Sequence, residues 1–595
     1  MEGFFHRIYV IDLERKRYEV QTVPEHVLET LLGGKGIGTY LLLRETGPIP
    51  PDPFAPENPL IFAIGPVTGL PIHGSSRYGV YTRSPQTGIY SESYSGGRVP
   101  VAMAACGADA FLLKGAAPRP VFLEITDHEV TFHDAGALWG KDTYMAEEAM
   151  KRQVGDPKAQ SVVIGPAGEN RIRFSTIASG KWRAAGRTGV GAVMGSKRVK
   201  GIVFHGAAVK AAADPGLLKQ VWKRLLKKAK GNPLVKAYQT QGTPMLVGIM
   251  NTIGGFPTKY WSQGSLPGWE KISAEGIQQA CETRSHACPH CFMACGKLTT
   301  VKEGPHAGLT ILGPEYETIY AFGGLCMIDD IGEIIHLNDL CDRLGIDTVT
   351  AGNLAAFTIE ASRRKVIPED YHYGNAGEVA EIIEKIARKE GIGALLSQGI
   401  REVSKAWGLQ DIAVHVKGLE PAGYEPRVLK GMGLAYATSD RGACHMRSSF
   451  YQAELTGKIA PGETEGKAEL FVAYEDFLTL FDTLILCRFY KDLMSWEDVG
   501  DLIRGATGLQ ATQPRLRKIA VAVTNATRTF NLRCGVTRES DKLPKRFYKE
   551  ALKGGKDSLA PEEMEKMLVA YYRLRGWDED GVPPPMEGIF STPGS

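Results

Sequence analysis

The sequence predicts an α+β protein, in which a β-rich N-terminal domain is followed by two mainly α-helical domains. Up to about residue 210, short β-branched and aromatic runs alternate with glycine, proline and serine clusters, as in strands joined by turns. Beyond that point, apolar residues recur at helical spacing among lysines and arginines. The length of 595 residues also exceeds one ordinary domain. We therefore expect domains at residues 1–210, 211–417 and 418–595.

The strands expected in the first domain are short apolar runs bounded by turn residues. They lie at residues 8–11, 60–64, 121–125, 162–164 and 202–204. Glycine is concentrated between them, and its lack of a side chain suits either a tight turn or a loop that approaches a ligand closely. The glycine clusters are at residues 33–36, 95–97 and 186–191.

The helical part is expected to begin at Asp214 and Pro215, because aspartate is a good N-cap and proline is favoured at the first helical position. A glycine- and proline-rich stretch near residues 418–427 divides it in two. The principal helices are expected around residues 331–344, 349–363, 378–389, 467–487 and 560–574.

Charge and composition exclude several classes of protein. Seventy lysines and arginines against 67 acidic residues leave a net charge of +3, which argues against a non-specific nucleic-acid binder. The N-terminus lacks the basic-then-apolar order of a signal peptide. The longest apolar stretches, near residues 60–67 and 484–487, are far shorter than a membrane span. We expect a cytoplasmic protein without a nucleic-acid or membrane partner.

Three cysteines with the spacing C-x2-C-x3-C predict a metal centre. Cys288, Cys291 and Cys295 are close enough in sequence to hold one face of an iron–sulfur cubane. Structural zinc is the alternative, although zinc sites usually add a second C-x2-C or a histidine pair. Spacing does not choose the fourth ligand, which is one of the remaining cysteines: Cys106, Cys281, Cys326, Cys341, Cys444, Cys487 or Cys534.

Two short frames of the form D-x4-[D/C] follow expected helices. The first runs from Asp342 to Asp347, with Gly345 placed to end the helix. The second runs from Asp482 to Cys487. Asp347 also fits a simple role as the N-cap of the next helix. The repetition of the frame, once with a cysteine at its end, favours a shared binding function.

With these motifs the chain resembles the tungsten-containing aldehyde ferredoxin oxidoreductases. The cysteine triplet matches the family, and the two frames match its D-x-x-G-L-[D/C] motifs, except that Ile485 replaces the glycine of the second. Residues 186–197, 313–318, 441–445 and 531–546 also resemble family blocks, in family order along the whole chain. The resemblance implies that the β-rich domain forms a base which the two helical domains cover.

The resemblance also implies the cofactors and the residues that hold them. A tungsten atom, or molybdenum in its place, would be bound by two pterins without a protein ligand. Cys288, Cys291, Cys295 and Cys487 would hold a [4Fe–4S] cluster, and Mg²⁺ would bridge the pterin phosphates. Tyr94 stands where the family often has a small polar residue, which puts the local magnesium contact in doubt. The implied pterin contacts are Arg77, Ser95, Gly96, Arg183, Ala184, Gly186, Asp342, Gly345, Asp347, Asp482 and Leu486.

The implied reaction is oxidation of a small aldehyde by water to a carboxylate, with two electrons passing to ferredoxin or to an iron–sulfur electron-transfer subunit. Glu315 is the candidate base and His445 the candidate donor to the substrate, with Glu317 as the alternative to Glu315. Glu333 and His336 form an E-x-x-H, which some family dimers use for an interface metal, but an ordinary helix pair is the favoured interpretation.

Three hypotheses about function remain open from the sequence. Aldehyde oxidation is the first, and a related catalytic subunit acting on aromatic acyl-CoA thioesters is the second. The third is an iron–sulfur electron-transfer protein without a catalytic metal, which leaves the glycine loops and aspartate frames unexplained. The chain is expected as a homodimer or as part of a hetero-oligomer.

Overall fold

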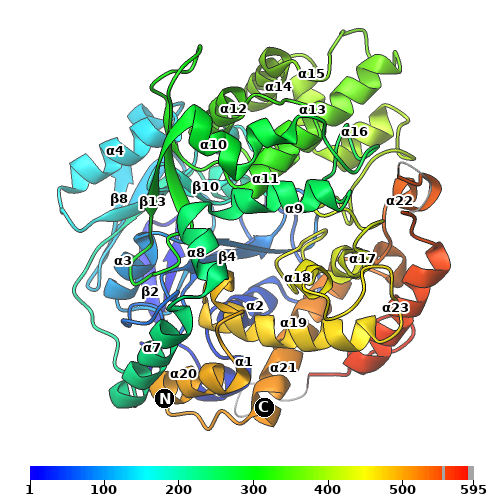
Figure 1. The fold of residues 1–595 in the computed structure, drawn as a ribbon. Helices are drawn as coiled ribbons and strands as arrows, with labels where there is room; N and C mark the ends of the chain where they lie inside the picture. Colours follow the sequence, from blue (N-terminus) through cyan, green and yellow to red (C-terminus); the bar gives the residue numbers. More distant parts are fainter. Residues whose placement is uncertain (553–556, 587–595) are drawn as a thin grey trace.

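The computed structural model describes residues 1–552 and 557–586 and has the α+β architecture that the sequence predicts (Figure 1). Two six-stranded sheets make up the N-terminal part. The first has the order β2-β1-β6-β3-β4-β5, and only its β1–β6 pair is parallel. Its strands are β1 (Arg7–Asp12), β2 (Arg17–Thr22), β3 (Leu60–Ala63), β4 (Tyr78–Arg83), β5 (Tyr90–Ser95) and β6 (Ala110–Lys114).

The second sheet has the order β11-β10-β9-β12-β7-β8, with β12 and β7 parallel. Its strands are β7 (Val121–Ile125), β8 (Val130–Asp134), β9 (Gln160–Val163), β10 (Ile177–Ser179), β11 (Arg183–Ala185) and β12 (Val199–Phe204). The helices around the two sheets are α1 (Glu25–Leu31), α2 (Lys35–Thr46), α3 (Val99–Ala105), α4 (Thr143–Val154), α5 (Pro166–Glu169) and α6 (Val190–Ser196).

Alternation along the strands explains how the two sheets stack. In β1, Tyr9 and Ile11 belong to a core shared with the second sheet, whereas Ile8 and Val10 face α1, α2 and α21 (Gln513–Arg533). In the second sheet, Phe122 faces the opposite way from its neighbours and packs with α4. The N-terminal part is therefore a sheet-on-sheet sandwich covered by helices on both outer faces.

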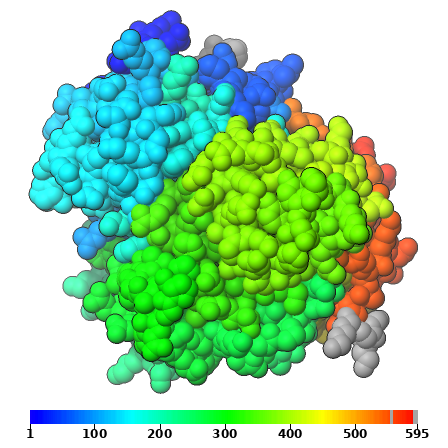
Figure 2. All heavy atoms as spheres, turned by 90° about the horizontal axis from the view of Figure 1, so that it is seen from above, coloured from blue at the N-terminus to red at the C-terminus, as the bar shows by residue number. Residues whose placement is uncertain are grey.

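Helices dominate the rest of the chain and lie over the sandwich (Figure 1), and Figure 2 shows the green and yellow-green atoms of this part packed against the blue and cyan atoms of the N-terminal part. The first group is α7 (Pro215–Ala229), α8 (Pro233–Thr240), α9 (Leu246–Thr252), α10 (Ala274–Ala280), α11 (Tyr316–Ile319), α12 (Ile331–Leu344), α13 (Thr348–Arg363), α14 (Ala376–Arg388), α15 (Ile392–Leu396) and α16 (Ile400–Ala406). The second, besides α21, is α17 (Lys430–Thr438), α18 (Tyr451–Leu455), α19 (Lys467–Leu484), α20 (Trp496–Thr507), α22 (Lys545–Lys549) and α23 (Pro561–Arg575).

The local signals in the sequence place most of these elements correctly. All five expected strands and all five principal helices are present, although α19 ends at Leu484, three residues before the expected end. Asp214 caps α7 by accepting from the backbone N–H of Leu217, and Pro215 is its first residue. A three-stranded sheet within the helical part was not expected: β13 (Cys281–His286), β14 (Gly296–Val301) and β15 (Thr310–Leu312).

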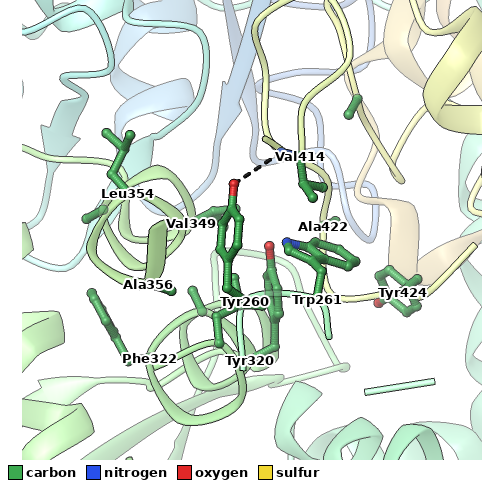
Figure 3. Packing of buried hydrophobic residues seen from close by; sticks show 14 of the residues in the cluster. Tyr260, Trp261, Tyr320, Phe322, Val349, Leu354, Ala356, Val414, Ala422 and Tyr424 are labelled. Atoms are coloured by element: carbon green, nitrogen blue, oxygen red, sulfur yellow. Dashed lines mark hydrogen bonds between the residues drawn. The ribbon is translucent and has the colours of Figure 1, made fainter. Parts of the chain in front are cut away.

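A large aromatic core fixes the helical part around α13 (Figure 3). Tyr260 and Trp261 are completely buried, and both polar ends are satisfied: the Tyr260 hydroxyl accepts from the N–H of Val414 at 3.1 Å, and Trp261 Nε1 donates to Asn353 at 3.0 Å. None of the helices in the described ranges has the length and apolar composition that a membrane crossing requires.

Candidate active site

A cavity of about 400 Å³ lies where the sandwich meets the helical part. Its wall on the sandwich side comes from the start of β4, from β5 and from the segment that follows β11. The opposite wall comes from the start of α11, the α12–α13 connection, the loop after α17 and the end of α19. Segments more than 400 residues apart in sequence thus form one site.

Six of the implied pterin contacts belong to the N-terminal part, and three of them line this cavity, namely Arg77, Ala184 and Gly186. Gly186 has no atom within 4 Å of the position that a Cβ would take, so its backbone is open to a ligand. The other three lie beside them. Ser95 ends β5 with a buried hydroxyl, a Cβ on Gly96 would lie 3.4 Å from the Cys288 sulfur, and Arg183 begins β11.

The second aspartate frame opens directly into the cavity. Asp482 and Leu486 line it, and the Asp482 carboxylate receives Arg447 and Arg488, each at 2.6 Å. Ile485, the residue that replaces the family glycine, adopts the left-handed conformation with φ 53° and ψ 49°. This closes α19 in the same way as Gly345 closes α12 with φ 75° and ψ 48°.

The residues of the first aspartate frame lie partly at the cavity and partly away from it. Asp347 lines the cavity, caps α13 through the N–H of Val349, and pairs with Arg187 at 3.1 Å. Asp342 and Gly345 do not line the cavity. Asp342 accepts from Asn338 at 2.7 Å, and burial together with the nearby Asp339 raises its pKa well above its usual range.

Several arginines, which the sequence analysis does not single out, carry the charge of the site. Arg447 joins Asp482 to the buried Glu92, also at 2.6 Å. Burial opposes ionisation of Glu92, but Arg447, Lys35 and Arg441 hold its pKa well below its usual range. Arg447 could have been noticed because it is two residues from His445, whereas no sequence pattern marks Glu92, which lies in a strand that is buried on both faces.

The site has the donors that an anionic, phosphate-bearing group needs. Among the described residues, Arg441 Nε, Arg447 Nε and Arg488 NH1 are buried without a hydrogen-bond partner. Guanidinium groups bind phosphate strongly, and leaving such donors unpaired is costly. Together with the open backbone at Gly186 and the cavity itself, these donors fit the pterin groups implied by the family resemblance. The Tyr94 hydroxyl is already used, since it donates to Glu92 at 2.7 Å.

The cysteine loop of residues 288–295 is held against the end of α19. Tyr490 accepts from the N–H of Phe292 and donates to the Cys291 sulfur at 3.4 Å. The N–H of Cys487 donates to the carbonyl of Gly74, whose own N–H donates to the carbonyl of His290. The structure thus places Cys487 beside the loop that contains Cys288, Cys291 and Cys295.

Four of the remaining cysteines have contacts elsewhere. Cys106 and Cys326 donate to backbone carbonyls, Cys444 accepts from Arg441, and Cys281 lies at the start of β13. Within the described ranges, no three histidine, cysteine, aspartate or glutamate side chains lie close enough to hold a single metal ion. Thiolates around a four-iron cluster stand farther apart than ligands of one zinc ion.

The structure separates the two candidate bases. Glu315 is exposed at the edge of the cavity and accepts from the Thr243 hydroxyl at 2.5 Å. Glu317 lies deeper and faces His445, with 3.5 Å between Oε1 and Nε2. Burial raises the pKa of Glu317 to about 7, while burial and four arginines, led by Arg441, lower the pKa of His445 well below 6.5. A carboxyl that ionises near neutrality thus faces a neutral imidazole.

The E-x-x-H pair lies away from the cavity. His306 contacts both members, with its Nε2 3.1 Å from Glu333 and its ring stacked on that of His336 at 4.2 Å. Both side chains are half-buried, and these contacts hold them within the chain.

Comparisons with known proteins agree with this architecture. Family models for the aldehyde ferredoxin oxidoreductase N-terminal domain and for domains 2 and 3 match residues 8–206 and 220–587. The tungsten-containing aldehyde ferredoxin oxidoreductase of Pyrococcus furiosus is 34% identical over 98% of both chains. That of Thermococcus kodakarensis is 34% identical over 98% of this chain and 97% of its own.

A more distant relative and a solved structure of the same fold each match almost the whole chain. The aliphatic sulfonate oxidoreductase WOR-like subunit of Pyrococcus furiosus is 26% identical over 98% of this chain and 96% of its own. The active-site complex BamBC of benzoyl coenzyme A reductase, solved with 1,5-dienoyl-CoA, superposes with a TM-score of 0.84 at 23% identity, covering 98% and 96% of the two chains. By its family models and its relatives, the chain belongs to the aldehyde ferredoxin oxidoreductase family.

Proposed function

We propose that this protein oxidises aldehydes with water to carboxylic acids and passes the two electrons to ferredoxin. The observation that carries the proposal is the pair Glu317 and His445, which face each other in a cavity bordered by unpaired arginine donors. Identity of 34% to tungsten-containing aldehyde ferredoxin oxidoreductases, against 23% to the benzoyl coenzyme A reductase complex, supports aldehydes over acyl-CoA thioesters.

The residues that would hold the cofactors follow from their positions. Arg77, Gly186, Asp482 and the arginines with unpaired nitrogens would bind two pterins and their Mg²⁺. Cys288, Cys291, Cys295 and Cys487 would hold a [4Fe–4S] cluster. When bound, the tungsten or molybdenum centre would supply two-electron oxidation and the cluster would supply one-electron transfer.

The acid–base chemistry belongs to the protein. An aldehyde and a water molecule give a carboxylate, three protons and two electrons. Glu317 would accept the proton of the attacking water at Oε1, because its raised pKa leaves it partly ionised at neutral pH and still basic. His445, held neutral, would donate an N–H to the aldehyde oxygen. Tyr316, Tyr424 and the other aromatic side chains of the cavity would exclude further water.

Metal analysis and an isotope experiment test the proposal. Anaerobically purified protein should contain about one tungsten or molybdenum and four irons, and aldehyde oxidation in H₂¹⁸O should place ¹⁸O in the carboxylate. Iron without either heavier metal would favour the electron-transfer hypothesis instead. Zinc in place of iron would refute the cluster.

The choice of Cys487 has its own test. Cys487→Ser should lower the iron content to about three atoms or fewer per chain, whereas Cys534→Ser, at a position outside the cysteine loop, should leave it unchanged. Equal iron content in the two variants would show that Cys487 is not a ligand.

A further inference from the structure

A second depression, a groove of about 660 Å³, reaches the cysteine loop from outside. Its walls come from α3, residues 157–160, residues 205–206 and residues 287–290. Cys288 lines this groove, whereas Arg77 lines the central cavity. Both are neighbours of Gly96: a Cβ there would lie 3.4 Å from the Cys288 sulfur and 3.6 Å from Arg77 NH1. The groove and the cavity are therefore separated by little more than these two side chains.

The groove is basic, in contrast to the nearly neutral chain. Arg98, Lys158, His205 and His290 line it, and no aspartate or glutamate is among the described residues that do so. Three carboxylates lie behind the lining residues: Asp127 Oδ1 is 3.0 Å from the position of a Cβ on Gly206, and Glu124 and Asp156 are paired with His205 at 2.8 and 3.2 Å.

Further positive charge stands beside the cysteine loop. Arg98 lines the groove, Arg183 Cδ lies 2.8 Å from the position of a Cβ on Gly97, and Arg284 belongs to β13. Arg98 and Arg284 are exposed. Glu282, two residues before Arg284, is the carboxylate on the same exposed strand.

The groove also has the apolar surface of a protein interface. Val101 is 39% exposed, and three alanines and two prolines also line the groove. Next to it, β13 is an edge strand whose residues after Cys281 are all exposed. An apolar centre inside a charged rim is typical of transient protein interfaces.

We propose that this groove is the docking surface for a small acidic iron–sulfur protein of the ferredoxin type, with its cluster placed opposite Cys288. The proposal rests on the function proposed above and adds the place where electrons leave. Each encounter reduces the carrier by one electron, so two encounters accept the electrons of one aldehyde. Complementary charge would speed the encounter and fix its orientation.

Binding measurements test the surface independently of catalysis. An acidic [4Fe–4S] ferredoxin is titrated into the wild type and into the triple variant Arg98→Glu/Lys158→Glu/Arg284→Glu by isothermal calorimetry at low salt. The variant should bind the ferredoxin about ten-fold or more weakly than the wild type does. The matched control, Lys405→Glu/Lys518→Glu/Lys566→Glu, reverses the charge of three exposed lysines on α16, α21 and α23. Its affinity for the ferredoxin should differ from that of the wild type by less than about two-fold. Equal loss in both triple variants would refute the proposal.

Two measurements on the wild type need no variant. Ferredoxin binding should weaken steadily as salt rises, and a basic c-type cytochrome of similar size should not bind. Salt-independent binding, or binding of the cytochrome, would overturn the surface. Aldehyde-dependent reduction of benzyl viologen reports the proposed function separately: its absence in metal-loaded protein that still binds ferredoxin would refute the function and keep the docking surface.

Discussion

Replacing Glu317 by glutamine removes the carboxylate that faces His445 while keeping the shape of the side chain. The amide can still accept from the N–H of Gly423, which now donates to Glu317 Oε2 at 3.0 Å, so the fold of the cavity should persist. What is lost is a proton acceptor, and a positioned general base is worth on the order of 10²–10⁴ in rate. We expect kcat/KM for an aldehyde to fall at least about 100-fold.

The pH dependence follows from the same carboxyl. Burial raises the pKa of Glu317 to about 7, and only the ionised form accepts a proton. The wild-type kcat/KM should therefore rise with pH, and a group of this pKa is about 10% ionised at pH 6 and about 90% at pH 8. The rate should increase about nine-fold over that interval, and the increase should disappear in Glu317→Gln.

The assay is aldehyde-dependent reduction of benzyl viologen under anaerobic conditions, at equal tungsten or molybdenum content in each sample. Glu315→Gln is the matched control, because Glu315 lies at the same cavity but is exposed and bonded to Thr243. The kcat/KM of Glu315→Gln should be less than about three-fold below that of the wild type. A large loss in Glu315→Gln with an active Glu317→Gln would reverse the assignment and restore Glu315 as the base.

Three further changes test other parts of the structure. Gly65→Ala should lower the free energy of unfolding, measured by urea titration, by about 3 kcal/mol, because a Cβ there would lie 2.0 Å from the carbonyl oxygen of Leu484. The control Gly462→Ala places its Cβ in open space and should change that free energy by less than about 0.5 kcal/mol. Tyr451→Ala should raise KM for benzaldehyde about five-fold more than for acetaldehyde, because it removes an aromatic wall of the cavity; equal effects would exclude that role. Burial lowers the pKa of Lys197 to about 7, so the folded protein binds fewer protons than the unfolded chain above that pH and its stability rises with pH. Lys197→Met should therefore lose about 2 kcal/mol of the stability gain measured between pH 7.5 and 9.5, and an unchanged gain would refute the shift.

Local signals in the sequence were sufficient for elements that depend on neighbouring residues. The N-cap at Asp214 and the helix end at Gly345 involve contacts a few residues apart, and both were predicted. The cavity depends instead on contacts between distant segments. Arg447 joins Glu92 to Asp482, and Glu317 meets His445, across separations that no local pattern reports. The family resemblance supplied the region of the site, but only the structure distinguishes two glutamates that are two residues apart.

Ile485 shows that the backbone conformation of a motif can be kept when one of its residue types differs. A β-branched residue in the left-handed conformation costs about 1–2 kcal/mol, which is why glycine is expected there. Its side chain is 2% exposed, and burying an isoleucine contributes about 1.5–3 kcal/mol, enough to offset the strain. Space for it comes from Gly34, where an added Cβ would lie 2.5 Å from Ile485 Cγ1. The missing side chain at Gly34 leaves room for Ile485, so the turn that carries Asp482 and Cys487 has the same left-handed conformation as the turn at Gly345, although its sequence departs from the family pattern.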